Sequence, residues 1–94
     1  MSFEEKSILF KSLGDPIRLK IVSRLCEGPL SANELLSGMD IAQPTLSHHI
    51  KILKQAGIIE ESKDKNRRIY NIDCDVLGEI VSSLNNFIEI CSNK

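Results

Sequence analysis

The sequence lacks any run of about eighteen consecutive apolar residues, so we expect no membrane-spanning helix and no membrane partner. Its first residues, MSFEEKSILFK, carry acids and no long apolar stretch, which argues against a signal peptide. We therefore expect a cytoplasmic protein.

Cysteine is also scarce and widely spaced. The three cysteines, at positions 26, 74 and 91, form no CxxC pair and do not suggest a secreted disulfide framework. No glycine-rich phosphate loop, HEXXH motif or recognisable nucleophile and base pattern is present. A small thiol-dependent enzyme built on Cys26 or Cys74 is thus not supported, and we expect no enzyme and no cofactor.

A strong net charge is missing as well. Twelve Lys and Arg residues against thirteen Asp and Glu give a net charge of −1, whereas DNA-binding proteins are usually basic. The charge is nevertheless unevenly distributed. Residues 42–70 carry six basic and three acidic residues, a net +3, and residues 71–94 carry one and four, a net −3. The first segment is suited to face phosphate, although +3 segments are also common on solvated surfaces.

The chain is long enough for one compact domain, which we place at residues 1–94. With 41% apolar and 27% charged residues, its composition is that of a globular protein. A helical domain of this size buries only a modest core and is often completed by a partner subunit.

Residues 31–56 indicate two short helices joined by a tight turn. Ser31 and Glu34 have the spacing of a capping box, which marks a helix start. Gly38-Met39-Asp40 ends that helix. Pro44 fits the first turn of the next helix, where the amides have no helical partner. The segment is therefore predicted to be a helix-turn-helix.

The second helix of this unit has two different faces. Leu46, Ile50 and Leu53 recur at spacings of four and three, which predicts a buried stripe. The polar and basic side chains predicted to point outward are Gln43, Thr45, Ser47, His48, Lys51 and Lys54. Hydrogen-bonding groups at the start of a helix, followed by cations, suit contacts to base edges and then to phosphates.

The flanking segments complete the expected architecture. Apolar spacing predicts helices over 3–13, over 16–26 with an Asp15-Pro16 start, and over 75–91. Two β-prone runs around a charged turn at Lys63–Asn66 predict a hairpin over 58–72. The fold class is mainly α with a small β-hairpin (α+β), in the order α-α-α-α-β-β-α. The last helix is apolar enough to form a dimer seam with the first, or else packs back on its own domain.

The phrases LGDPIRLKI, AQPTLSHHIKILKQAGI and RRIYNI, in this order of elements, resemble the ArsR/SmtB family of winged helix-turn-helix repressors. The resemblance covers about residues 7–90. It implies a homodimeric, sequence-specific DNA-binding transcriptional repressor acting on an inverted-repeat operator, associated with the nucleoid, and in many members released by an effector. It also places Gln43, Thr45, Ser47 and His48 at base-contacting positions and Arg67 and Arg68 in the wing. Ala42 departs from the frequent Ser before the Gln-Pro pair, which removes a side-chain N-cap worth about 1 kcal/mol.

The effector sites usual in that family do not match. Arsenic- and lead-type members carry Cys-x-Cys where this chain has Ser31 and Asn33. Positions matching the zinc-type site are Cys74, Val76, Phe87 and Ile90, which offer one ligand where a site needs about four. We therefore expect neither metal site, and the effector stays open.

The remaining cysteines and histidines have competing interpretations. Cys26 and Cys91 lie near, but a few residues from, the cysteines of family members that sense persulfide or oxidants, so a redox-responsive repressor is one alternative. Cys74 of one subunit could also approach Cys91 of another, or each cysteine could be a buried small hydrophobe. His48 and His49 point about 100° apart on a helix and are poorly placed to share a metal. A winged-helix module for protein contacts is the other alternative.

Overall fold

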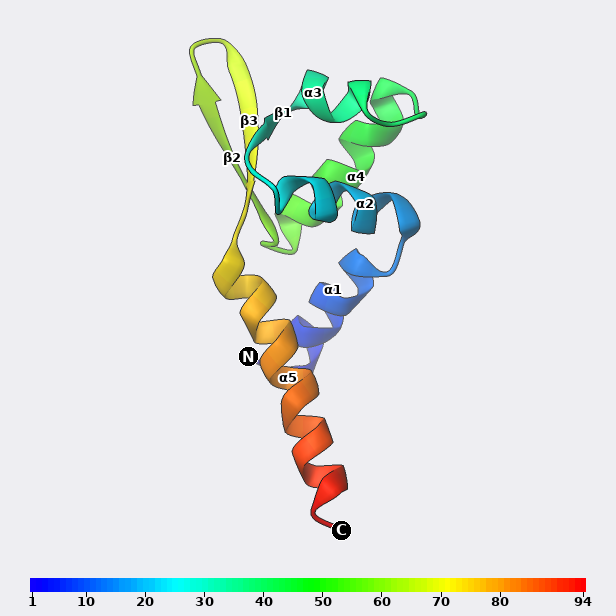
Figure 1. Ribbon diagram of the computed structural model, residues 1–94, viewed down its shortest axis with the longest axis vertical. Coiled ribbons are helices and arrows are strands. Elements are labelled where there is room, and N and C mark those ends of the chain that lie inside the picture. Colours follow the sequence, from blue (N-terminus) through cyan, green and yellow to red (C-terminus); the bar gives the residue numbers. More distant parts are fainter.

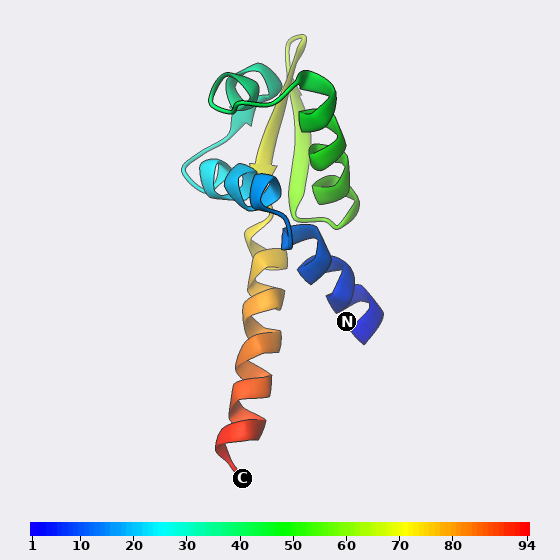
Figure 2. The same ribbon diagram turned by 90° about the vertical axis from the view of Figure 1, so that its right-hand side faces the viewer.

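The structure, a computed structural model, describes residues 1–94. In chain order it contains α1 (Phe3–Leu13), α2 (Pro16–Leu25), β1 (Leu30–Ser31), α3 (Ala32–Ser37), α4 (Gln43–Gln55), β2 (Ile59–Asp64), β3 (Arg67–Ile72) and α5 (Cys74–Ser92). Helices α2 to α4 and the sheet form the upper body in Figure 1, and α5 extends from it in both Figure 1 and Figure 2. The molecule measures 53 × 25 × 23 Å. The predicted winged helix-turn-helix class is confirmed.

Local sequence signals fix most helix starts. Ser31 and Glu34 form the predicted capping box of α3, and Asp15 caps α2 by accepting from the amides of Ile17 and Arg18. Ala42 is the N-cap of α4 and makes no side-chain bond, as its apolar side chain predicts. A second capping box, Ser2 with Glu5, starts α1. These caps satisfy amides that have no partner within the helix.

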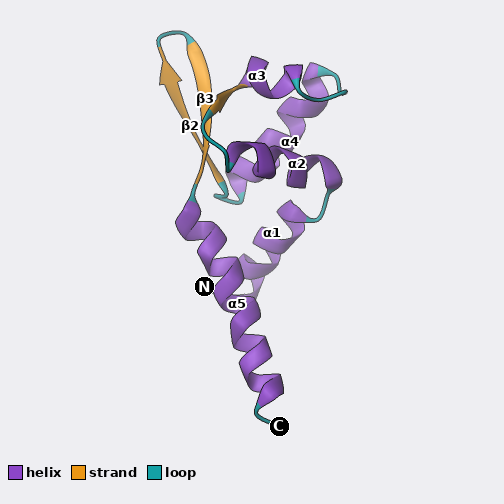
Figure 3. Ribbon diagram, in the orientation of Figure 1, coloured by secondary structure: helices purple, strands orange, loops and turns teal.

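The sheet has three antiparallel strands in the order β1-β3-β2, so the expectation of a two-stranded hairpin alone is corrected (Figure 3). Leu30 pairs with Tyr70, and Ile59 pairs with Ile72. A strand of two residues has no periodicity to detect, and β1 exists only because β3 lies beside it. The predicted Lys63–Asn66 turn is also shorter than expected, because β2 continues to Asp64 and leaves Lys65 and Asn66 as the turn.

One core lies between the helices and the sheet. The predicted stripe of α4 is confirmed, since Leu46, Ile50 and Leu53 are all buried. The apolar Leu19 of α2 is 53% exposed, and in α1 Leu9 and Ser12 are buried while Ile8 is exposed. The fully buried side chains are Ile21, Leu25, Leu35, Leu53 and Ile58.

Helix α5 packs on the body through its N-terminal half, as far as Ser83. Ile80 and Ser83 are buried, and Val76 and Leu77 pack against the core. Beyond them the helix stands away from the body (Figures 1 and 2). Its large apolar side chains that remain exposed are Val81, Leu84, Phe87, Ile88 and Ile90. No helix of the chain has both the length and the apolar character to cross a bilayer.

Candidate nucleic-acid interface

Helix α4 presents its polar face to solvent. Leu46, His49, Ile50 and Leu53 face the core, and the six side chains predicted to point outward are all exposed: Gln43, Thr45, Ser47, His48, Lys51 and Lys54. Pro44 stands in the first turn, and Gly57, with a φ of 82°, follows the last one. Glycine adopts this left-handed conformation without the strain of a side chain.

The six outward residues divide into two groups. At about 100° per residue, Gln43, Ser47, Lys51 and Lys54 fall within about 80° of one another, on the side of α4 that faces the wing. Thr45 and His48 lie further around the helix. His48 packs edge-on against His49, with ring centroids 5.5 Å apart. The sequence pattern predicted a single polar face, whereas in the structure only the first group lines the hollows beside the wing.

Two neighbouring hollows, both lined by Ser47, Ile50, Arg68 and Tyr70, lie along the junction of α4 and the hairpin. One, of about 430 Å³, is lined by residues of α3, α4 and the hairpin, among them Asn33, Gln43, Ser47, Arg67 and Arg68. The other, of about 360 Å³, is lined by Ser47, Ile50, Lys51, Lys54, Gln55, Glu61, Arg68 and Tyr70. The structure thus brings the first group of α4 residues and both wing arginines to one concave surface, which we call the α4–wing surface.

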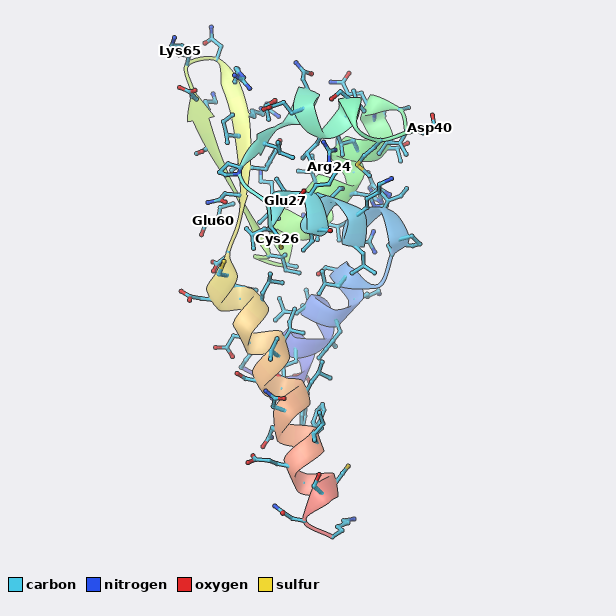
Figure 4. All side chains as sticks on the ribbon, viewed as in Figure 1. Arg24, Cys26, Glu27, Asp40, Glu60 and Lys65 are labelled. Carbon is cyan, nitrogen blue, oxygen red and sulfur yellow. The ribbon has the colours of Figure 1, made fainter.

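The basic side chains of the hairpin come from both strands and from the turn. Arg67 and Arg68 open β3, and Lys65 lies at the tip (Figure 4). Lys65 has a φ of 59°, which a residue other than glycine rarely adopts and which marks a tight hairpin turn. Basic side chains therefore extend from the C-terminal half of α4 to the end of the wing.

Two of the predicted cations are already paired with carboxylates. Nζ of Lys54 lies 2.9 Å from Oε1 of Glu61, and Nη2 of Arg67 lies 3.0 Å from Oε1 of Glu34. The hydrogen bond from Lys54 lowers the pKa of the Glu61 carboxyl group below its ordinary value. Burial, and then the charge of Glu61, raise the pKa of Tyr70, which lies opposite Glu61 on β3. Neither pair was predicted, because helix and strand periods carry no information about which charges meet across elements.

Arg24 holds the turn before α4 in place. Its guanidinium donates to the carbonyls of Glu34, at 2.9 Å, and Leu35, at the end of α3 (Figure 4). Gly38 has no side chain here, and a Cβ at that position would lie 2.6 Å from the Arg24 guanidinium. The sequence predicted that a helix ends at Gly38, but it did not predict that the Arg24 side chain lies beside this glycine.

The cysteines do not behave as buried hydrophobes, so that alternative is wrong for the single chain. Cys26, Cys74 and Cys91 are all exposed and free. Cys26 caps the end of α2 within the body (Figure 4), whereas Cys91 lies in the last turn of α5, at the far end of the molecule. No three His, Cys, Asp or Glu side chains lie close enough together to hold a metal ion.

A helix-turn-helix with an exposed polar second helix, followed by a basic hairpin, defines a winged helix-turn-helix DNA-binding protein. Residues 15–61 match the family described as bacterial regulatory protein, arsR family. The chain belongs to the arsR family of transcriptional regulators. These proteins are regulators and not enzymes, so the expectation that the chain is not an enzyme is confirmed.

Several curated relatives carry the names of repressors. The chain is 39% identical over 85 residues to the arsenical resistance operon repressor of Staphylococcus aureus, covering 90% of this chain and 82% of the relative. It is 34% identical over 80 residues to the transcriptional repressor SdpR of Bacillus subtilis, covering 85% and 89% of the two chains. The match therefore extends well beyond the helix-turn-helix.

Solved structures share the whole fold. A crystal structure of an ArsR family transcriptional regulator aligns with a TM-score of 0.92 and 26% identity, covering all of this chain and 97% of the other. The repressor BigR of Xylella fastidiosa aligns with a TM-score of 0.70 and 30% identity over 89% and 87% of the chains. A DNA-binding domain of Mycobacterium bovis, described as homodimeric, aligns with a TM-score of 0.76 at 21% identity, covering 97% of this chain and 85% of that one.

Proposed function

We propose that the chain acts as a homodimeric repressor that binds an inverted-repeat operator through the α4–wing surface. The observation that supports this most directly is the continuity of that surface: Gln43 and Lys51 of α4 line one hollow each, and Ser47 of α4 and Arg68 of the wing line both. A helix enters the major groove of B-DNA, and a basic hairpin beside it can follow the phosphate backbone. The protein acts at the nucleoid, where its DNA is.

Each predicted residue has a distinct role in this proposal. Gln43, Thr45, Ser47 and His48 read base edges, because their donors and acceptors stand on the N-terminal half of α4. Lys51, Lys54, Arg67 and Arg68 bind phosphates, which positions the helix without selecting a sequence. The placement of Thr45 and His48 away from the wing makes them readers of the bases farthest from the hairpin.

The proposed partner is a second copy of the chain, held through α1 and α5. The exposed residues of α5 include Leu84, Phe87 and Ile88, and α1 adds Phe3 and Ile8. Leu84, Phe87 and Ile88 lie within about 100° of one another around α5, and exposed apolar side chains that cluster in this way mark an association site. The relative from Mycobacterium bovis that is described as homodimeric has the same arrangement of helices.

Dimerisation combines the weak DNA contacts of two subunits into one specific complex. One subunit reaches only a few phosphates, and the second doubles that number while fixing two α4 helices about one turn of B-DNA apart. An inverted repeat presents the same bases to each subunit, since a two-fold axis relates both the protein and the site.

Band shifts with duplexes selected from a random pool test this function. We expect Lys51→Ala to weaken binding to selected and random duplexes alike, and Ser47→Ala and Gln43→Ala to relax the choice of particular base pairs. Equal losses on both duplexes for all three variants would refute the assignment of roles. A wild-type chain that binds no duplex at low salt would instead favour a module for protein contacts.

A thiol response is a second candidate, favoured by the exposure of Cys26 and Cys91. Exposed thiols are open to oxidation, and a bridge between two of them needs Cα atoms within about 7 Å. The separation of the two cysteines within one chain requires that any such bridge join different subunits. Loss of DNA binding on oxidation should disappear in Cys91→Ser and persist in Cys74→Ser. Unchanged oxidant sensitivity in Cys91→Ser would remove this candidate.

A further inference from the structure

Two of the four cations assigned to phosphate are occupied by carboxylates of the same chain. Lys54 holds Glu61 at 2.9 Å, and Arg67 holds Glu34 at 3.0 Å. The partners come from different elements in each case, α4 with β2 and β3 with α3. A phosphate that approaches either cation therefore meets a carboxylate that is already bound there, and the two anions compete for the same positive charge.

Glu61 is the better placed of the two carboxylates. It lines the α4–wing surface together with Ser47, Lys51 and Arg68, and its side chain is 23% exposed against 41% for Lys54. The groups that face it are Lys54 from α4 and Tyr70 and Arg68 from β3. A carboxylate oxygen thus already bonds Lys54, a cation of α4 that the proposed function assigns to phosphate.

We propose that Glu61, with Glu34 in a supporting role, limits the affinity of the chain for the DNA backbone by competing with phosphate for Lys54 and Arg67. This inference rests on the proposed function and deepens it. Phosphate contacts supply nearly all of non-specific binding, so the competition weakens the attachment of one subunit to any duplex. Stable binding then depends on the base contacts and on the second subunit. The net charge of −1 is in line with a limited affinity of the chain for the DNA backbone.

The matched control is on the same strand. Glu60 pairs with Asn71 in the sheet, and its side chain points away from α4, because neighbouring side chains of a strand alternate between its faces (Figure 4). Glu60→Gln removes the same charge as Glu61→Gln and leaves the Lys54 pair intact. Any difference between the two variants therefore reports the competition and not the overall charge.

The binding experiment measures Kd for a random duplex and for a selected duplex at fixed salt. One exposed ion pair changes an equilibrium constant by about 1.4- to 5-fold. A dimer that binds DNA breaks two Lys54–Glu61 pairs, one in each subunit. Glu61→Gln should therefore tighten binding to both duplexes by about 2- to 30-fold. Glu60→Gln should tighten it less. Glu34→Gln is the second variant, and it keeps the capping box because glutamine also serves at that position.

Proton uptake on binding gives an independent readout. In the free chain Lys54 holds the pKa of Glu61 down, and on DNA the carboxylate loses that partner and gains a neighbouring phosphate, so its pKa rises. Complex formation should therefore be accompanied by proton uptake at acidic pH. Titration calorimetry in two buffers of different ionisation enthalpy should show greater uptake for the wild type and Glu60→Gln than for Glu61→Gln.

The outcomes separate this inference from the function on which it rests. Tighter binding and reduced proton uptake in Glu61→Gln alone support the competition. A wild-type chain that binds DNA, with equal gains in Glu61→Gln and Glu60→Gln, overturns the inference and leaves the proposed function standing. A wild-type chain that binds no duplex overturns both.

Discussion

Nδ1 of His49 lies 3.0 Å from Nη1 of Arg18, so a buried ring on the core side of α4 is hydrogen-bonded to a guanidinium of α2. The same arginine donates through Nε to the carbonyl of Ser12, at 2.6 Å, near the end of α1. Because Arg18 can only donate, Nδ1 of His49 accepts, and the ring proton is assigned to Nε2. Helices α1, α2 and α4 thus meet at the Arg18 side chain, which fixes the position of α4 relative to α1 and α2.

We expect His49→Phe to lower the free energy of unfolding by about 1–3 kcal/mol, because Arg18 loses an acceptor in a partly buried place. Urea unfolding followed by circular dichroism measures this. His48→Phe is the control, since His48 is exposed on the same helix and should change stability by less than about 0.5 kcal/mol. Equal stability of the two variants would show that the hydrogen bond does not support the fold.

The cap of α4 offers a stabilising change. Ala42 has the extended backbone of an N-cap, with φ −76° and ψ 153°, but no side-chain oxygen. Ala42→Ser should raise stability by about 1 kcal/mol, because the hydroxyl can accept from a free amide of the first turn. Ala56→Ser, at the other end of the helix, where no free amides stand, should bring no gain. A rise in Tm for both variants would argue against the capping explanation.

The carboxylate of Asp15 should make stability depend on pH. The amides of Arg18 and Ile17 bond it and hold its pKa below the ordinary value. A pKa lowered in the folded state contributes stability that is complete above the unfolded pKa, about 3.9, and is lost as pH falls through the folded value. Asp15→Asn should therefore have a lower Tm than the wild type at pH 7, and the gap between the two Tm values should narrow towards pH 3. A constant gap between these pH values would contradict this.

The exposed half of α5 should control assembly. Leu84→Glu places a charge in the apolar surface of α5 and should shift the chain from dimer to monomer in sedimentation velocity experiments. Asn86→Glu is the control, because its side chain lies about 200° around the helix from Leu84. If Leu84→Glu sediments as the wild type does, α5 is not the seam.

Salt should weaken DNA binding steeply. If each subunit neutralises about three phosphates, the plot of log K against log salt should have a slope of about −5 for the dimer and about −3 for a Leu84→Glu monomer. Filter binding at about 50 to 200 mM salt measures this slope for both proteins. Equal slopes for the two proteins would mean that only one subunit contacts the duplex.

Several features followed from short stretches of sequence. The capping box of Ser31 and Glu34, the N-cap of Asp15 and the buried stripe of α4 depend on neighbours within a few residues, where spacing alone decides. Helix α5 was predicted at 75–91 and runs from Cys74 to Ser92, because its apolar spacing is strong.

Features that join distant parts of the chain were missed. Strand β1 forms only where Leu30 meets Tyr70, forty positions away in sequence. The exposure of Leu19, against the burial of Leu9, depends on which side of each helix the rest of the body covers. The ion pair of Lys54 with Glu61 joins a helix to a strand, and no periodic pattern encodes it.

The sequence by itself determined the helices, the polar surface of α4 and the family, because these depend on residue types at fixed local spacing. Only the tertiary structure decided which of the cations stay free and which meet a carboxylate, and how α4 is fixed through His49 to Arg18. The physical reason is range: hydrogen bonds within a helix turn are set by neighbours, whereas contacts between elements exist only after the apolar core has brought those elements together.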